Sequence, residues 1–548
     1  MNEIELVRSM MEQNSAFVHE VDSDNVTPLH WAALDNHMEV ANLLVQAGAR
    51  LDVFTNLEGH SPLDWACIRG NLKMILFLIS CGATIDRRDK RGYHALHHCV
   101  MYNHLEAAFY LLHEYHLDVE MTDDLGHTLL MWASYSGFVP MMRILLREHA
   151  DVTKTDKDGK TALQWAACKG RTSAVELLLR VGADHRSEAP INAAKDRKFF
   201  DTSTYLEIAR NNPSVRLEGR KAFKHQLYFL PFFFVPWVFF SFAYAPFLLL
   251  SFLLMGGPIY LIWKHYLQVR WINDTEDRNP FYLGIFISSY LLSITVYFTV
   301  LLPAKIPTLQ DIYIDTPEGK TLGPDSYSAL YFILFNLIWF ISYMGLLYQD
   351  PGIIPKDSTP IKDILAGLRS GKGSYCVTCQ VRRPLRSKHC RSCDQCVARF
   401  DHYCPWINND VGYGNHRLFL VELLGICINH WWFINLCSDY LAFTMTDDIS
   451  SSYFYSIPYV LDHDPVVFLM ILYHFLFGLW QSYNLFASLV LISINLTTNE
   501  NLRKKNYPYL WKDNKFFNLW HRGVLNNIYE FVLHRVDYYN TFDVYGEA

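Results

Sequence analysis

Six of the twelve cysteines lie in one stretch of 29 residues, and most of them have the spacing of metal ligands. The pattern Cys-x2-Cys occurs three times, first as Cys376 and Cys379 and then twice in succession from Cys390 to Cys396, and His389 immediately precedes the second run. Thiolates and an imidazole at such spacing supply the tetrahedral shell that Zn²⁺ requires. The stretch therefore predicts bound zinc, although a purely structural zinc knuckle would show the same spacing. The candidate ligands are Cys376, Cys379, His389, Cys390, Cys393 and Cys396.

The last cysteine of this stretch, Cys404, has different neighbours. It follows Asp401 and His402 and precedes a Pro-Trp pair. A thiol next to a basic side chain is typical of a nucleophile, because the base can help to form the reactive thiolate. We therefore interpret Cys404 as a nucleophile and not as a metal ligand.

The N-terminal part of the chain repeats every 33–34 residues. Residues 27–33 read Thr-Pro-Leu-His-Trp-Ala-Ala, and related segments begin at positions 61, 94, 128 and 161. This period and this motif are those of ankyrin repeats. We count five clear repeats and expect residues 1–24 and 189–212 to form degenerate capping repeats, because the end of a stacked solenoid needs a polar outer face.

Four tryptophans share one position of the repeat: Trp31, Trp65, Trp132 and Trp165. They could form an aromatic ladder on a binding face, or they could fill the space between repeats. We favour filling for most of them and keep Trp65 as a candidate for protein docking.

Uncharged hydrophobic runs follow the repeats. Residues 227–263 contain no Asp, Glu, Lys or Arg, and this length suffices for two spans because one crossing takes about 20 residues. Four further runs bring the expected number of spans to six: 281–304, 326–349, 418–443 and 466–496. His430 and His474 lie deep within the last two runs and are expected to face other helices.

The distribution of Lys and Arg predicts the orientation in the membrane. The connections expected on the lumenal side contain zero, two and zero basic residues, whereas loop 350–417 contains eleven and the tail after the sixth span seven. The positive-inside rule places the repeats, this loop and both termini in the cytosol. The sequons at Asn25, Asn273 and Asn495 then lie on or at the edge of the cytosolic side, so no N-glycan is expected.

The composition agrees with a chain that is in part a membrane protein. Of 548 residues, 51% are hydrophobic and 15% aromatic. The cysteines cluster instead of forming an even framework, so we expect reduced thiols and metal and no disulfides. The net charge of −7 is unevenly spread, and no nucleic-acid partner is expected.

Taken together, residues 376–419 resemble the cysteine-rich domain of the DHHC family of protein S-acyltransferases (palmitoyltransferases). Besides the cysteines, the matching positions are Arg383, Pro384, Arg386, Asp401, His402, Cys404, Pro405, Trp406, Asn409, Gly412, Asn415 and Phe419. Smaller motifs resemble the family's DPG, TTxE and C-terminal PaCCT segments: 350–352, 497–500 and 518–531. With ankyrin repeats in front, the whole order resembles the huntingtin-interacting-protein-14 and yeast ankyrin-repeat subclass.

The chain departs from the family pattern at Tyr403 and Asp410. The resemblance implies a first zinc site with all four ligands present, namely Cys376, Cys379, His389 and Cys396. It implies a second site of Cys390 and Cys393 in which Tyr403 and Asp410 replace the other two ligands. Tyrosine is a poor zinc ligand, whereas aspartate can donate an oxygen. We expect one secure zinc and a second site that is weakened or vacant; alternatively Cys390, Cys393, Asp410 and water still hold a metal.

The activity that the resemblance implies is thioester exchange. Long-chain acyl-CoA would acylate Cys404, with His402 as general base and Asp401 orienting it, and a cysteine of a substrate protein would then take the acyl group. Zinc would be structural, membrane lipid would surround the acyl chain, and the ankyrin repeats would dock substrate proteins. The alternative is a non-catalytic, membrane-anchored ankyrin adaptor with a degenerate zinc domain. Basic residues near the cluster could face CoA phosphates or simply be solvated: Arg382, Arg383, Arg386 and Lys388.

The expected fold class is all-α, with an ankyrin solenoid, six transmembrane helices and a small cytosolic zinc-binding domain. The subclass suggests the Golgi or another endomembrane. The predicted segments are ankyrin repeats at 1–212, a linker at 213–226, spans one to four at 227–349, the cysteine-rich domain at 350–417, spans five and six at 418–496, and a cytosolic tail at 497–548.

Overall fold

A computed structural model describes most of the chain. The described residues are 3–211, 281–306, 324–371, 373–444, 463–512 and 515–533, with short stretches at 235–236, 313–316, 319–322, 460–461 and 538. They form two compact units, Met1–Ala222 with Pro355–Arg382, and Phe223–Ile354 with Arg383–Ala548. Nearly all of the hydrophobic run 227–263, where two spans are predicted, lies outside the described residues.

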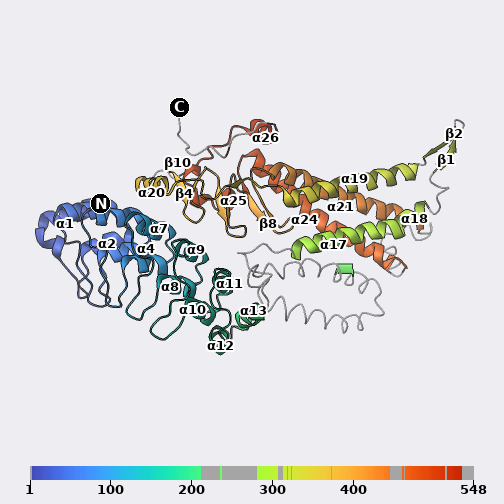
Figure 1. Cartoon of the computed structure of the whole chain (residues 1–548). Helices are drawn as coiled ribbons and strands as arrows, with labels where there is room; N and C mark the ends of the chain where they lie inside the picture. Colours follow the sequence, from blue (N-terminus) through green and yellow to red (C-terminus); the bar gives the residue numbers. More distant parts are fainter. Residues whose placement is uncertain are drawn as a thin grey trace. The chain divides into compact units, whose positions relative to one another are not determined.

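The first unit contains a stack of helix pairs, as the repeats predict (Figure 1). The first helices of three repeats begin with a capping box, in which Ser61, Thr128 or Thr161 accepts a hydrogen bond from the backbone N–H three residues later. The helices are α1 (Glu3–Gln13), η1 (Ser15–His19), α2 (Pro28–Asp35), α3 (Met38–Gln46), α4 (Pro62–Arg69), α5 (Leu72–Ser80), α6 (Ala95–Met101), α7 (Leu105–Glu114), α8 (Leu129–Ser136), α9 (Val139–Arg147), α10 (Ala162–Cys168), α11 (Thr172–Arg180), α12 (Ala189–Asp196) and α13 (Phe200–Asn211).

The repeat tryptophans do not all fill the space between repeats. Trp132 and Trp165 are half-buried, and their indole N–H groups donate to Asp123 and Asp156. Trp65 is half-buried too and contacts the ring of Trp31 at 5.3 Å. Trp31, in the first full repeat, is 53% exposed.

The first unit also contains the start of the cysteine-rich segment. Its helix α20 (Ile361–Ser370) precedes strands β4 (Ser374–Cys376) and β5 (Val381–Arg383). Arg147 of α9 donates to the carbonyl of Thr378 at 3.4 Å, and Arg369 of α20 lies 3.8 Å from Glu114 of α7. The ankyrin helices and this segment are therefore in direct contact.

The second unit is built on long apolar helices. They are α17 (Phe281–Val296), which continues through the π-helical η4 (Tyr297–Leu301) into α18 (Leu302–Lys305), and α19 (Pro324–Tyr348), α21 (His416–Thr444) and α24 (Pro465–Ser493). Within the described part of the chain, four helices are long and apolar enough to cross a membrane: Tyr282–Lys305, Ser326–Tyr348, His416–Thr444 and Pro465–Ser493. They coincide with four of the six predicted spans. His430 and His474 face each other, with their Nδ1 atoms 2.9 Å apart, so the expectation that they point at other helices is confirmed.

Short strands lie at both ends of these helices (Figure 1). The hairpin of β1 (Tyr313–Thr316) and β2 (Gly319–Leu322) is at one end. At the other end lie a sheet in the order β3 (Ile353–Ile354), β7 (Gln395–Val397), β6 (Lys388–Cys390) and the hairpin of β8 (His402–Cys404) with β9 (Asn409–Val411). The description all-α therefore needs a correction: the chain is mostly helical, but strands of two to four residues, too short to show a period-two pattern, hold the cysteine-rich segment.

The C-terminal tail follows α24 directly. It contains α25 (Thr498–Leu502), η5 (Lys504–Asn506), η6 (Pro508–Leu510), β10 (Trp511–Lys512), β11 (Lys515–Phe516) and α26 (Val524–Val532). Asn527 of α26 donates to the carbonyl of Ser493 at 2.7 Å, which fixes the tail to the end of α24.

Candidate active site and metal centres

Strand β8 positions Cys404. Its pairing with β9 places Cys404 opposite Asn409 and His402 opposite Val411. Because side chains alternate along a strand, His402 and Cys404 share one face and Tyr403 takes the other. The Cys404 side chain is only 6% exposed and belongs to an apolar cluster with Leu283, Ile287, Trp339, Tyr343, Leu346, Ile407 and Val411. The thiol thus lies against the ends of α17 and α19.

Asp401 and His402 form a close pair beside this thiol. His402 Nδ1 lies 2.7 Å from Asp401 Oδ2, and the other oxygen, Oδ1, accepts a 2.8 Å hydrogen bond from the backbone N–H of Thr498. Burial opposes ionisation of Asp401, but the neighbouring His416 and His402 and the Thr498 N–H outweigh it and hold the pKa of this carboxyl well below its usual range. Asp401 is therefore an anion that orients the imidazole.

The environment also favours the charged form of His402. Burial acts against the imidazolium, but hydrogen bonds to Asp401 and to Cys404 outweigh it and raise the pKa of His402 to about 10. An imidazolium next to a cysteine stabilises the thiolate, which is the nucleophilic form. The three side chains can therefore form a thiolate–imidazolium pair supported by a carboxylate.

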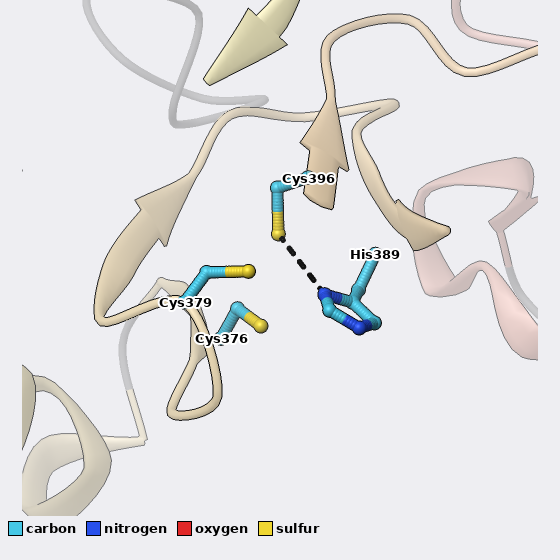
Figure 2. Close-up of side chains that lie close together, drawn as sticks. All are labelled: Cys376, Cys379, His389 and Cys396. Carbon is cyan, nitrogen blue, oxygen red and sulfur yellow. Dashed lines mark hydrogen bonds between the residues drawn. The ribbon is translucent and has the colours of Figure 1, made fainter. Parts of the chain in front are cut away.

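Four donors of the cysteine-rich segment converge on one point (Figure 2). The donor atoms of Cys376, Cys379, His389 and Cys396 all lie within 4.8 Å of one another. The pairing of β6 with β7 sets His389 opposite Cys396, with Nδ1 3.9 Å from Sγ. Three thiols and one imidazole are a ligand set of structural zinc sites, so these residues fit Zn²⁺.

A second group has three donors, Cys390, Cys393 and Asp410, again within 4.8 Å of one another. Cys390 Sγ donates to Asp410 Oδ1 at 2.9 Å, and Asp410 is fully buried. Its second oxygen, Oδ2, makes no hydrogen bond within the described part of the chain, which suits a cation at this place. Tyr403 packs against the cluster of Cys390, Val397 and Phe400, and its hydroxyl donates to Asn408 Oδ1 at 2.9 Å.

Comparison with known proteins agrees with this arrangement. A family model described as DHHC palmitoyltransferase matches residues 369–505, and a model of ankyrin repeats matches residues 1–89, 52–123 and 96–189. The chain combines ankyrin repeats with a DHHC palmitoyltransferase domain. The resemblance indicated by the sequence motifs is thereby confirmed.

Curated proteins with related sequences are named palmitoyltransferases. Palmitoyltransferase ZDHHC17 of Mus musculus is 29% identical over 538 residues, which are 93% of this chain and 75% of the mouse protein. Palmitoyltransferase akr1 of Neurospora crassa is 30% identical over 235 residues, 41% of this chain and 30% of the fungal protein. Palmitoyltransferase AKR1 of Candida glabrata is 29% identical over 472 residues, 80% of this chain and 59% of that protein. This chain thus spans less than two thirds of both fungal relatives.

Arg386, one of the four basic residues considered for CoA binding, is buried. Arg386 is 3% exposed, and its guanidinium donates to both carboxylate oxygens of Glu500 at 2.8 and 2.6 Å and to Asn495 at 3.0 Å. The Lys388 ammonium, half-buried, donates to Asn499 at 2.9 Å. Arg386 therefore joins the cysteine-rich segment to the TTxE motif and does not face solvent.

The sequence analysis did not identify the residues that surround the Cys404 thiol at the ends of the apolar helices. Trp339 and Tyr343 of α19 pack in the cluster of Cys404, and the Tyr343 hydroxyl donates to the carbonyl of Trp406 at 2.8 Å. Trp339 also lines a small cavity between α17, α19, α21 and α24, together with Phe286, Tyr290, Phe332, His430 and His474. Aromatic residues are common in membrane spans, so the sequence contained no signal that marked these.

Proposed function

We propose that the chain is a protein S-acyltransferase that carries a long-chain acyl group from acyl-CoA to cysteines of substrate proteins through a thioester on Cys404. The observation that supports this most is the Asp401–His402–Cys404 arrangement set against the ends of membrane helices. The Cys404 thiolate attacks the thioester carbonyl of acyl-CoA, and the bond to the CoA sulfur breaks. His402 gives its proton to the departing CoA thiolate and then accepts the proton of the substrate cysteine, whose sulfur displaces Cys404.

The apolar surroundings of Cys404 support a place for the acyl chain. Phe286 and Trp339 belong both to the cluster around Cys404 and to the lining of the cavity between the helices. Burial of an acyl chain contributes about 0.8 kcal/mol per CH2, so a long chain between the helices binds much more tightly than a short one. CoA itself stays in water.

The metal sites have a structural role in this proposal. Cys376, Cys379, His389 and Cys396 would hold one Zn²⁺ that fixes the fold of the segment ahead of β8. Cys390, Cys393 and Asp410 offer one donor fewer and would hold a second ion more weakly. No part of the acyl transfer uses either ion.

We further propose that the cysteine-rich segment and both termini are cytosolic, in an endomembrane such as the Golgi. The segment with β8 and the β1–β2 hairpin lie at opposite ends of the four apolar helices (Figure 1). The basic residues concentrate on the side of the cysteine-rich segment. An epitope at residue 318 should therefore be protected from protease in sealed vesicles, whereas one at the C-terminus should be digested; the reverse pattern would refute this orientation.

The function is tested with purified protein and labelled palmitoyl-CoA. The protein should take up label in a bond that neutral hydroxylamine cleaves, because hydroxylamine attacks thioesters and spares amides. It should then pass the label to a cysteine-containing peptide. Absence of both steps would favour the alternative of a non-catalytic adaptor.

Asp401→Asn should slow self-acylation by about 10²-fold and change its pH dependence. The interactions with Asp401 and Cys404 raise the pKa of His402 to about 10, so the imidazolium persists well above pH 6.5, the ordinary pKa of histidine. Without the charge of Asp401 the pKa of His402 falls. The imidazolium, which must protonate the CoA thiolate, then loses its proton at a lower pH than in the unaltered protein. The rate–pH profile should therefore lose its alkaline end in the variant first. An unchanged profile would contradict the role of Asp401.

We also propose that the ankyrin repeats dock the substrate proteins, and exposed Trp31 is a candidate contact. Trp31→Ala should reduce transfer to a full-length substrate protein about tenfold, as expected when a binding tryptophan is truncated. Self-acylation should not change. The matched control is Trp165→Phe, which alters a half-buried indole of the same repeat position. Equal transfer by Trp31→Ala and the unaltered protein would argue against docking through this surface.

A further inference from the structure

A group of potential metal ligands lies inside the ankyrin stack. The donor atoms of His60, Asp89 and His98 are all within 4.8 Å of one another. The Nε2 atom of His60 is 3.3 Å from Asp89 Oδ2, and that of His98 is 3.6 Å from the same oxygen. A tetrahedral Zn²⁺ with bonds of about 2.0–2.2 Å separates neighbouring nitrogen and oxygen donors by roughly 3.3–3.6 Å. Both distances thus have the length of an edge of a zinc coordination tetrahedron.

These donors are buried and aimed at one another. Asp89 is 9% exposed and His98 only 3%. The oxygen Oδ1 of Asp89 accepts hydrogen bonds from the backbone N–H groups of Arg91 and Tyr93, both at 2.8 Å, which turns Oδ2 toward the histidines. Among the residues that the structure describes, neither Asp89 Oδ2 nor His98 Nε2 makes a hydrogen bond. Buried polar atoms of this kind call for a partner.

The neighbouring repeats show what normally fills this place. Asp123 and Asp156 occupy the position of Asp89 in the next two repeats, and the residue nine positions later is a tryptophan in both. The Trp132 indole donates to Asp123 Oδ2 at 3.2 Å, and the Trp165 indole donates to Asp156 Oδ2 at 2.8 Å. In the repeat of Asp89 this position is His98. The exchange removes the indole donor and places a second imidazole, with His60, beside the carboxylate.

We propose that His60, Asp89 and His98 bind a Zn²⁺ ion that links two adjacent ankyrin repeats. Two imidazoles and a carboxylate are a nitrogen-rich donor set that suits Zn²⁺ better than Mg²⁺ or Ca²⁺, which prefer oxygen alone. A fourth donor is near, because Asp64 Oδ1 lies 3.9 Å from His98 Nε2. Two carboxylates would balance the charge of the ion. The His60 side chain is 16% exposed, so the site has access to solvent.

His98→Trp tests this site with the residue that the neighbouring repeats use. The full-length protein is purified, exposed to excess ZnCl2, freed of loose metal and analysed for zinc. The unaltered protein should hold one equivalent more than the variant, and added Zn²⁺ should raise the unfolding temperature of the repeats in the unaltered protein but not in His98→Trp. The control is His127→Phe. His127 has the same place in its repeat as His60, but the aspartate next to it, Asp156, accepts a hydrogen bond from Trp165. This variant should keep the full zinc content.

A second variant, His60→Gln, covers the case in which a tryptophan does not fit at position 98. It removes one donor from a partly exposed position and should also lose one equivalent. Far-UV circular dichroism and self-acylation report whether each variant is folded. Equal zinc content in the unaltered protein and in every folded one of these two variants would overturn the proposal. The loss of one equivalent in either folded variant, with none in His127→Phe, would support it.

Discussion

Cys404→Ser should abolish the acyl-enzyme. The hydroxyl of serine is far less acidic than a thiol, so the imidazolium of His402 cannot keep it as an anion. Loss of a nucleophile reduces the rate by about 10⁴-fold or more, and hydroxylamine-sensitive label should fall to background. Serine is nearly the same size as cysteine, so zinc content and membrane insertion should not change.

The matched control is Cys81→Ser in the ankyrin stack. Cys81 is exposed, whereas Cys404 is 6% exposed. Spontaneous acylation by acyl-CoA would select the exposed thiol, and catalysis selects the buried one. Cys81→Ser should therefore keep full label. If Cys404→Ser kept its label and Cys81→Ser lost it, Cys404 would not be the nucleophile.

Cys379→Ser should unfold the cysteine-rich segment, whereas Cys393→Ser should do much less. Cys379 is fully buried and belongs to the group of four donors, which can complete a tetrahedral shell. Structural zinc in such shells contributes about 10–16 kcal/mol, and this binding energy becomes folding energy. Cys393 belongs to the group of three donors with Cys390 and Asp410, one donor fewer than a tetrahedral shell requires. Replacement of Cys393 therefore removes less metal-binding energy than replacement of Cys379.

Zinc analysis combined with limited proteolysis of the segment 350–417 measures both effects. The unaltered segment should retain one zinc after dialysis against a moderate chelator, in addition to any ion held by the repeats. Cys379→Ser should lose it and become sensitive to protease. Two tightly held zincs in this segment, with equal damage from both variants, would show instead that Cys390, Cys393 and Asp410 form a complete site.

The sequence predicted those parts of the protein that depend on short-range patterns. The ankyrin period located α2 to α11, and the uncharged runs located α17, α19, α21 and α24. The Cys-x2-Cys spacing selected Cys376, Cys379, His389 and Cys396, which the structure brings together. Each of these patterns repeats a local geometry, a helix pair, a span or a ligand turn, and such geometry requires no knowledge of distant contacts.

Contacts between distant residues could not be predicted in this way. Arg386 was one of four basic residues that could face CoA phosphates or solvent, because basic side chains of a loop usually face water. Its ion pair with Glu500 joins residues 114 positions apart, and only the fold shows that both are buried. Asp401 is oriented by a hydrogen bond from the backbone N–H of Thr498, 97 residues away, and this contact could not be predicted for the same reason. The TTxE motif was recognised from the types and order of its residues, but its role in supporting the site depends on tertiary structure.

A single-turnover reaction tests the central claim most directly. Purified protein is mixed with one equivalent of palmitoyl-CoA and quenched at neutral pH, free CoA is measured, and the acylated peptide is identified by mass spectrometry. Our account predicts that each CoA released corresponds to one acyl group, that this group is on Cys404, and that it leaves when a thiol acceptor is added. Release of CoA with the acyl group on Cys81 or another exposed thiol, or with no acylated protein at all, would contradict it.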